Sequence, residues 1–188
     1  MNRQDAKAAK KLDMEERVRI EPVAEADVER LAVLAREIWL AHYPAIIGIA
    51  QIEYMLAQRY QPDVVRAELG RDGIWWDKLV AGREMAGFAS YFLTGTPGEM
   101  KLDKLYVHPA RQRCGYGGRM IARAADRGRH QGCDRLILAV NKSNQGAIAA
   151  YLKHGFQVVD AVVKDIGGGF VMDDYVMVKS IYNQDYKI

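Results

Sequence analysis

The spacing of hydrophobic residues along the chain predicts a series of strands and helices. Alternating or unbroken apolar runs are typical of strands, and apolar residues three or four positions apart are typical of helices. Strands are predicted over residues 17–22, 74–80, 84–93, 100–107, 136–140, 157–165 and 170–179, and helices over residues 24–41, 52–60, 62–69, 116–131 and 144–154. This order predicts an α/β fold with a mixed sheet, in which the unbroken run 136–140 is a central parallel strand.

Length and composition favour one globular domain. The chain has 188 residues, of which 49% are hydrophobic, enough for a sizeable core. We expect this domain over residues 17–182, between an N-terminal tail (1–16) and a C-terminal tail (183–188). The N-terminal tail mixes lysines with acidic residues and lacks the apolar stretch of a secretory signal. Nowhere does the chain reach the run of about 18 apolar residues that a membrane span needs.

Cysteine content and charge narrow the function further. Cys114 and Cys133 form neither a CxxC motif nor a metal-ligand spacing, so we expect a reduced, cytoplasmic protein without a metal site. The net charge of +3 is too small to require a nucleic-acid partner, and no recognised binding module accompanies the arginines between residues 111 and 135. We interpret most of these arginines as a solvated helix face.

The most informative segment is a glycine-rich turn between a predicted strand and a predicted helix. It reads His-Pro-Ala-Arg-Gln-Arg-Cys-Gly-Tyr-Gly-Gly-Arg-Met over residues 108–120. Glycines let a backbone approach a ligand closely, and the first amides of a helix can bind an anion. A pyrophosphate is the expected anion. The dinucleotide and P-loop motifs are both excluded, because Met120 stands at the third glycine position of the first and Arg119 follows Gly118 where the second needs lysine.

Two motifs together resemble the GCN5-related N-acetyltransferase (GNAT) family. The first is Gln112-x-x-Gly115-x-Gly117, and the second runs from Asn144 through Tyr151 to the pair Gly155-Phe156. The resemblance covers roughly residues 17–180, and the second half is most similar to the bacterial polyamine-type acetyltransferases. It implies a mixed, largely antiparallel sheet of about seven strands flanked by helices, with a central parallel pair (100–107 and 135–141) that splays apart. It also implies acetyl-CoA as cofactor and a homodimer.

The same resemblance assigns residues to the coenzyme. The strand edge would pair with the pantetheine arm, the glycine turn would hold the pyrophosphate, and the helix after the next strand would complete the site. The residues are Leu105, Tyr106, Val107, Gln112, Arg113, Cys114, Gly115, Tyr116, Gly117, Gly118, Asn144 and Lys153. An alternative interpretation of Cys114 is a small residue tolerated in the turn. Asn144 is also a candidate N-cap of its helix, a role compatible with coenzyme binding.

The catalytic candidates follow from the chemistry of acetyl transfer to an amine. By the resemblance, Tyr151 protonates the departing sulfur, although a tyrosine on an apolar helix face is also typical of a core residue. The backbone amide of Leu105 or Val107 would stabilise the oxyanion. At the position where many relatives carry a glutamate base the chain has Lys101, so Asp103 or Glu99 would hold a water that removes the amine proton. Both acids are equally consistent with exposed charges on a strand. A further alternative is that ordered water alone removes the amine proton, without a base residue.

The acceptor would bind between the loop after the first helix and the last two strands. Candidate residues are His42, Tyr43, Tyr54, Asp173 and Asp174, of which the two aspartates would attract a cationic amine unless they only solvate the start of a strand. The sequence therefore predicts an acetyl-CoA-dependent N-acetyltransferase that acts on the primary amine of a small molecule, such as a polyamine, by direct attack in a ternary complex. Acetylation of protein N-termini or lysines, and a coenzyme-A-binding module without turnover, are the alternatives.

Overall fold

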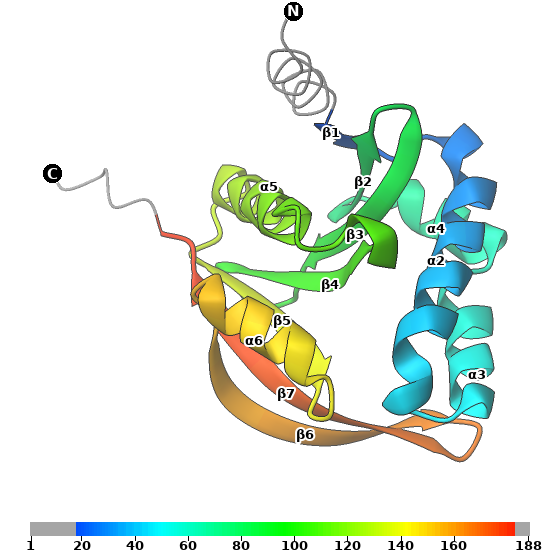
Figure 1. Ribbon diagram of the computed structural model, residues 1–188. Helices are drawn as coiled ribbons and strands as arrows, with labels where there is room; N and C mark the ends of the chain where they lie inside the picture. Colours follow the sequence, from blue (N-terminus) through cyan, green and yellow to red (C-terminus); the bar gives the residue numbers. More distant parts are fainter. Residues whose placement is uncertain (1–17, 183–188) are drawn as a thin grey trace, which may run out of the picture.

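A seven-stranded sheet forms the centre of the molecule, in the order β1-β2-β3-β4-β5-β7-β6 (Figure 1). The computed structural model describes residues 18–182, so the two predicted tails lie outside the described residues. The strands are β1 (Val18–Pro22), β2 (Ile74–Ala81), β3 (Glu84–Leu93), β4 (Glu99–Val107), β5 (Arg135–Asn141), β6 (Gln157–Gly167) and β7 (Phe170–Ser180). All neighbouring strands are antiparallel except the central pair β4 and β5, which is parallel. The predicted mixed sheet is thereby confirmed.

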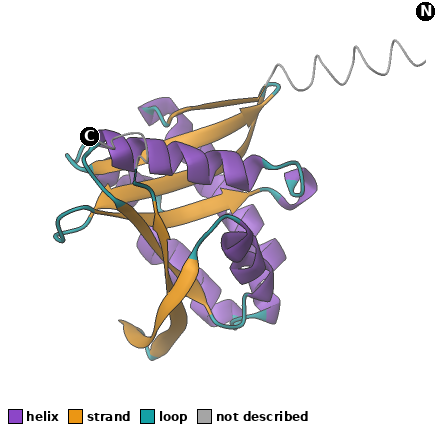
Figure 2. Cartoon of the chain, turned by 90° about the vertical axis from the view of Figure 1, so that its left-hand side faces the viewer, coloured by secondary structure: helices purple, strands orange, loops and turns teal. Residues whose placement is uncertain are grey.

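Helices cover both faces of the sheet (Figures 1 and 2). One face carries α2 (Val28–His42), α3 (Ile49–Arg59) and α4 (Pro62–Leu69), and the other carries α5 (Tyr116–His130) and α6 (Gln145–Lys153). Each layer packs on its own hydrophobic cluster, so two cores sandwich the sheet. Among the described residues, the helices are too short or too polar to cross a membrane.

Helix ends differ slightly from the sequence prediction. The first helix begins at Val28, after a 3-10 turn (η1, Glu25–Asp27), and continues to His42, where a second 3-10 turn (η2, Tyr43–Ala45) takes over. The second helix begins at Ile49 rather than at residue 52, because Gly48 provides the extended N-cap conformation directly before it. A third turn, η3 (Pro109–Arg111), follows β4. These differences move helix ends by a few residues and leave every predicted element in place.

The central parallel pair separates soon after it forms. Its register covers only Glu99–Lys101 of β4 against Arg135–Ile137 of β5. Beyond this point β5 continues to pair with β7 over its whole length, whereas β4 has no described partner on the β5 side. The splayed pair implied by the family resemblance is therefore present, and it leaves a strand edge open at the centre of the sheet.

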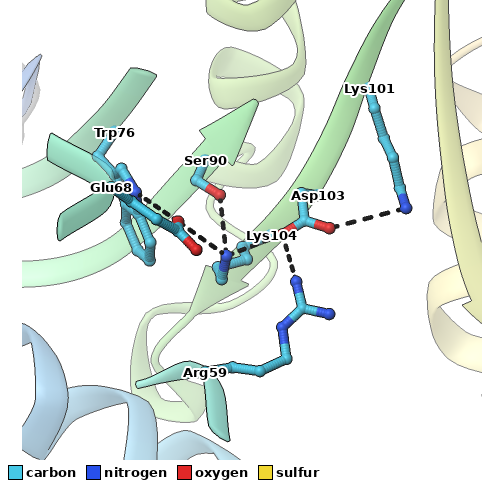
Figure 3. A network of polar contacts seen from close by, with 7 residues as sticks. All are labelled: Arg59, Glu68, Trp76, Ser90, Lys101, Asp103 and Lys104. Atoms are coloured by element: carbon cyan, nitrogen blue, oxygen red, sulfur yellow. Dashed lines mark hydrogen bonds and ion pairs between the residues drawn. The ribbon is translucent and has the colours of Figure 1, made fainter. Parts of the chain in front are cut away.

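A bulge changes the register of β4 beside this opening. Pairing with β3 shifts between Ser90 and Tyr91, which skips Asp103 on β4. Consequently Lys101, Asp103 and Lys104 all take part in contacts on the face covered by α2, α3 and α4 (Figure 3). Bulges redirect side chains in this way without ending a strand.

Candidate active site

The glycine turn after β4 holds its backbone in a conformation suited to an anion. Gly115 is the N-cap of α5 with a φ of 77°, and it makes no side-chain capping bond. Arg113 has a φ of 60° and is the only described non-glycine residue with a positive φ. The amides of Tyr116, Gly117 and Gly118 belong to the first turn of α5, where no intrahelical acceptor exists, and the first helical bond runs from Arg119 N–H to the Gly115 carbonyl at 3.2 Å. Free amides at a helix N-terminus are a ready site for pyrophosphate.

The three glycines of this turn have different roles. A Cβ atom added at Gly115 or Gly117 would meet no other atom within 4 Å, so the space in front of both is open to a ligand. A Cβ at Gly118 would lie 2.4 Å from Cε1 of His154, at the end of α6. Gly118 therefore lets the His154 ring pack against α5. His154 was not among the sequence candidates, since no local pattern indicates that it contacts a residue 36 positions earlier.

Gln112 closes the turn through its side chain. Its Nε2 donates to the Val107 carbonyl at 3.2 Å, which ties the turn to the end of β4. Cys114 lies exposed next to it, with its Sγ 3.5 Å from the Gln112 carbonyl. The structure thus gives Gln112 a role in shaping the turn.

The open edge of β4 presents two amides toward the gap. His108 N–H donates to the Ala86 carbonyl of β3 at 2.8 Å. Because backbone groups alternate in direction along a strand, the N–H groups of Leu105 and Val107 point the other way, toward the side of β5. No described strand pairs with them there. They are the donors expected for a ligand that enters between the two strands.

Asn144 links the two sides of the gap. Its Oδ1 accepts from the Ala147 N–H at 3.2 Å, the N-cap bond of α6, and lies 3.3 Å from His42 Nε2. His42 is the last residue of α2, 102 positions earlier in the chain. Two candidates that the sequence could not connect are therefore in contact. Lys153 lies exposed at the other end of α6.

Four phenols gather where the strands separate. Tyr106 comes from β4, Tyr43 from η2, Tyr60 from the residue after α3, and Tyr151 from α6. Burial raises the pKa of Tyr151 to about 12, and burial together with the neighbouring phenols raises the pKa of Tyr43 and of Tyr106 well above the usual value. Each phenol therefore keeps its proton at neutral pH and can donate a hydrogen bond. Tyr60 was not among the sequence candidates.

Asp103 is ion-paired from several directions (Figure 3). It accepts from Arg59, pairs with Lys104 Nζ at 2.8 Å, and lies 3.8 Å from Lys101 Nζ. Burial alone would raise the pKa of Asp103, but Lys104 and Arg59 outweigh it and hold this pKa at about 2. A carboxylate held this strongly in its ionised form is a poor proton acceptor. The environment of Asp103 therefore argues against the base role expected from the sequence.

The cations around Asp103 bind the helices to the sheet. Lys104 is 2% exposed, and its Nζ also lies 3.3 Å from Glu68 of α4 and 4.7 Å from the centre of the Trp76 ring. Arg59 reaches Asp103 from the end of α3. A buried ammonium with two carboxylate partners is compensated, whereas one without them would be strongly destabilising. This cluster has the character of a structural tie.

The two aspartates of the last strand are in different environments. Asp173 is ion-paired with Lys142, and half of its side chain is exposed. Asp174 Oδ1 is buried and has no hydrogen-bond partner among the described residues. Burial and the charge of Asp173 raise the pKa of Asp174, while Lys101 and Lys142 act in the opposite direction. Alternation along β7 puts Asp174 on the same face as Met172, which packs under α2 and α3, and its charge acts on Tyr43.

Tyr54 contacts the hairpin between β6 and β7. Its hydroxyl donates to the Ile166 carbonyl at 2.7 Å, and its ring lies against Gly167 and Gly168. The structure thus separates the five acceptor candidates into those near the gap, namely His42, Tyr43 and Asp174, and two with structural partners, Tyr54 and Asp173.

Comparison with known proteins agrees with this geometry. The model of the acetyltransferase (GNAT) family matches residues 33–156, more than half of the chain. No curated protein matches the sequence. Among solved structures, PaiA N-acetyltransferase from Thermoplasma acidophilum, in complex with coenzyme A, is similar with a TM-score of 0.75 and 23% identity over 87% of this chain and 98% of that one.

Two further structures show the same fold. YncA from Salmonella typhimurium, with acetyl-CoA, has a TM-score of 0.63 and 18% identity over 88% of this chain and 95% of that one. A chimera of the spermidine N-acetyltransferase SpeG from Vibrio cholerae and hSSAT has a TM-score of 0.65 and 14% identity over 88% of this chain and 96% of that one.

The chain belongs to the acetyltransferase (GNAT) family. It is accordingly a transferase of the class that moves an acyl group from acetyl-CoA to an acceptor. The open β4 edge and the free amides of the glycine turn fit this cofactor.

Proposed function

We propose that this enzyme acetylates the primary amine of a small molecule by direct attack within a ternary complex. The observation that carries the proposal is the buried carboxylate oxygen of Asp174, which has no partner among the described residues and whose charge acts on Tyr43, one of the four phenols. A buried polar atom without a partner is costly unless a ligand or water satisfies it. An ammonium group supplies both the charge and the hydrogen-bond donor that this atom lacks.

The coenzyme side of the site would be formed mainly by backbone. Amides of Tyr116, Gly117 and Gly118 would bind the pyrophosphate, with Gln112 and Arg113 shaping the turn. The amides of Leu105 and Val107, on either side of Tyr106, would bind the pantetheine arm of the coenzyme along the open edge of β4. Cys114, Asn144 and Lys153 would border this site. When bound, acetyl-CoA supplies an acetyl group activated as a thioester.

Tyr151 would hold a proton next to the sulfur. The pKa of its phenol is about 12, well above the value near 8.5 expected for a thiol by analogy with cysteine. Complete transfer of the proton would be uphill, so we infer that the phenol stabilises the developing thiolate by hydrogen bonding. Leu105 or Val107 N–H would stabilise negative charge on the carbonyl oxygen.

Asp174, rather than Asp103, would prepare the acceptor. An alkylamine is largely protonated at neutral pH and must lose a proton before attack. A carboxylate with a raised pKa binds the ammonium first and accepts its proton more readily than Asp103 does. His42 and Tyr43 would border the acceptor. The spermidine acetyltransferase chimera of similar fold makes polyamines the first amines to test.

The experiment is an amine panel with acetyl-CoA and a thiol reagent that reports released coenzyme. The panel holds spermidine, putrescine, amino acids and a lysine-containing peptide. We expect turnover with a small amine, and at least a tenfold loss of kcat in Tyr151→Phe at unchanged acetyl-CoA affinity. Acetylation of the peptide alone would select the protein-acetyltransferase alternative, and coenzyme binding without any turnover would select the binding module. The cytoplasmic location remains a prediction from the sequence.

A further inference from the structure

Lys101 lies on β4 at the point where the central parallel pair separates. Its backbone forms the last register pair of the two strands, with Ile137 of β5. Met100 and Leu102, on either side of it, are buried in the core under α5 and α6, so strand alternation directs Lys101 to the opposite face of the sheet. That is the face covered by α2, α3 and α4.

Asp174 lies on the same face, two strands away. Its neighbour Tyr175 packs against the core under α5 and α6, so Asp174 points away from that core. Asp174 pairs with Asn141 of β5, four residues beyond Ile137, which corresponds to about 13 Å along the strand. Lys101 is nevertheless near enough for its charge to oppose the rise in the pKa of Asp174 that burial causes.

The surface of β5 between these two charged residues is apolar. Ile137 and Ala139 point to the same face as Lys101 and Asp174, because the residues that alternate with them are buried in the core under α5 and α6. Ala139 is exposed, and Ile137 is partly buried. An alkyl chain that lies along β5 from Lys101 to Asp174 would therefore contact apolar side chains.

The other carboxylates near this surface already have cationic partners. Asp103 is held by Arg59 and by Lys104, whose Nζ is 2.8 Å away. Asp173 is ion-paired with Lys142. A polyamine carries several ammonium groups, and all but one of them would have to displace a lysine or an arginine from its carboxylate here. The arrangement of charges does not favour such an acceptor.

Two opposite charges remain without a close partner. The buried oxygen of Asp174 has no hydrogen-bond partner within residues 18–182. Lys101 Nζ is 3.8 Å from Asp103, beyond hydrogen-bond distance, and 5.8 Å from the centre of the Phe92 ring. Its side chain is 33% exposed and lies apart from the other cations of the network (Figure 3). An anionic group of the acceptor would give Lys101 a charge-assisted hydrogen bond, as the amine would for Asp174.

We propose that the acceptor is an aminocarboxylate, with its amine at Asp174, its carboxylate at Lys101, and a short alkyl chain between them along β5. This inference rests on the proposed function, because it takes Asp174 as the site of the ammonium group. The separation of the two residues favours ω-amino acids. In α-amino acids both charged groups are attached to one carbon atom, which is too short to reach both residues.

This orientation agrees with the chemistry of transfer. Asp174 lies beside Asn141, at the end of β5 where β4 has moved away, whereas Lys101 lies where the two strands still pair. The amine is thus at the open end, where the thioester would lie. Its nitrogen forms a bond to the acetyl carbon as the carbon–sulfur bond breaks. The ammonium loses two protons in all, one to the departing sulfur and one through Asp174 to solvent.

Matched acceptors test the proposal in the assay of released coenzyme. The acceptors ε-aminocaproate, pentylamine and hexanediamine have alkyl chains of similar length and share one amine. They differ at the other end, which carries a carboxylate, no charge or a second ammonium group. In the wild type we expect kcat/KM for ε-aminocaproate to exceed that for each of the other two by about tenfold or more.

Substitutions of Lys101 assign this preference to one residue. Lys101→Ala should remove the preference for ε-aminocaproate over pentylamine, Lys101→Arg should keep it, and Lys101→Glu should favour hexanediamine. Lys164→Ala is the matched control. It removes an exposed lysine of β6 that is not among the groups acting on Asp174, and the preference should stay as in the wild type. Each value is a ratio measured within one protein, so partial loss of folded protein does not change it.

The outcomes separate this inference from the proposed function. Turnover of small amines without a preference for the carboxylate, or a preference that persists in Lys101→Ala, would overturn the aminocarboxylate and leave acetyl transfer to a small amine standing. A higher kcat/KM for spermidine than for ε-aminocaproate would do the same. Absence of turnover with every small amine would overturn both.

Discussion

Asp103 on β4 and Asp174 on β7 are two carboxylates that neighbour the same gap and Lys101, yet their surroundings are opposite. Asp103 is held by Arg59 and Lys104, and its pKa is about 2. Asp174 has a buried oxygen without a described partner and a raised pKa. The comparison teaches that burial alone does not define a reactive carboxylate. What distinguishes the two is whether the chain itself supplies the cation.

The largest expected effect is a loss of activity when Asp174 is replaced. Asp174→Asn should lower kcat/KM for the amine by about 100-fold or more, because it removes the ammonium partner and proton acceptor. Its neighbour Asp173 is the matched control, since Asp173→Asn removes the same charge from a residue already paired with Lys142 and acts on turnover only through the pKa of Asp174, so the loss should be far smaller. Steady-state kinetics with the best amine of the panel is the measurement. Equal losses in both variants would assign the effect to net charge.

The pH profile sharpens the same assignment. As pH falls through the raised pKa of Asp174, the base gains a proton and kcat/KM should decline. The groups that face this carboxylate are Lys101 from β4, Lys142 after β5, Asp173 on its own strand and Tyr43 from η2. In Asp174→Asn this acid limb should disappear and only the titration of the amine itself should remain. Persistence of the limb would point to another base.

The next effect is the contribution of Asp103 to the free energy of unfolding at acidic pH. Because the folded pKa of about 2 lies below the ordinary 3.8, this carboxylate stabilises the fold above pH 4 and loses its contribution as pH falls from about 4 to 2. The difference corresponds to ~2 kcal/mol. Urea unfolding of the wild type and of Asp103→Asn across this range measures it. The free energies of unfolding of the two proteins, plotted against pH, should converge toward pH 2. Parallel curves would contradict the ion pairing of Asp103.

The smallest effect has the opposite sign. The folded pKa of Asp174 is raised, so its ionised form destabilises the fold above that pKa, and the penalty vanishes below the ordinary value. Asp174→Asn should therefore raise Tm at pH 7 by about 2–4 °C, as expected for roughly 1 kcal/mol in a chain of this size. Thermal unfolding at pH 7 and pH 3.5 checks this. A variant that is less stable at pH 7 would show that Asp174 has a structural partner.

The local sequence pattern was enough to predict the strands, the helices and the glycine turn. Hydrophobic spacing located every strand and helix, and the glycine turn was recognisable because Gly115 and the helix after it lie in one continuous segment. The splayed pair came from the family resemblance and is present in the register of β4 and β5.

Side chains that meet from distant segments were less predictable. Asp103, like Glu99, was expected from its place on the strand to hold a water that removes the amine proton, and nothing in the sequence indicates that Arg59, 44 residues earlier, reaches it. Asp103 is the extra residue of a bulge on β4, where the register with β3 shifts, and His154 packs on Gly118 through the relative placement of two helices. Asp174 was named from the sequence as a residue that would attract a cationic amine, but its buried oxygen without a described partner required three-dimensional information.

The short overlap between β4 and β5 has a mechanical consequence. Only three residue pairs join β1–β4 to β5–β7 through main-chain bonds, so the sheet consists of two leaves that meet at a narrow hinge. At the open end, the spacing of the leaves rests on side-chain contacts such as the 3.3 Å approach of His42 to Asn144. Side chains change rotamers far more readily than strands exchange partners. The width of the gap is thus set by side-chain packing and not by a continuous ladder of main-chain hydrogen bonds.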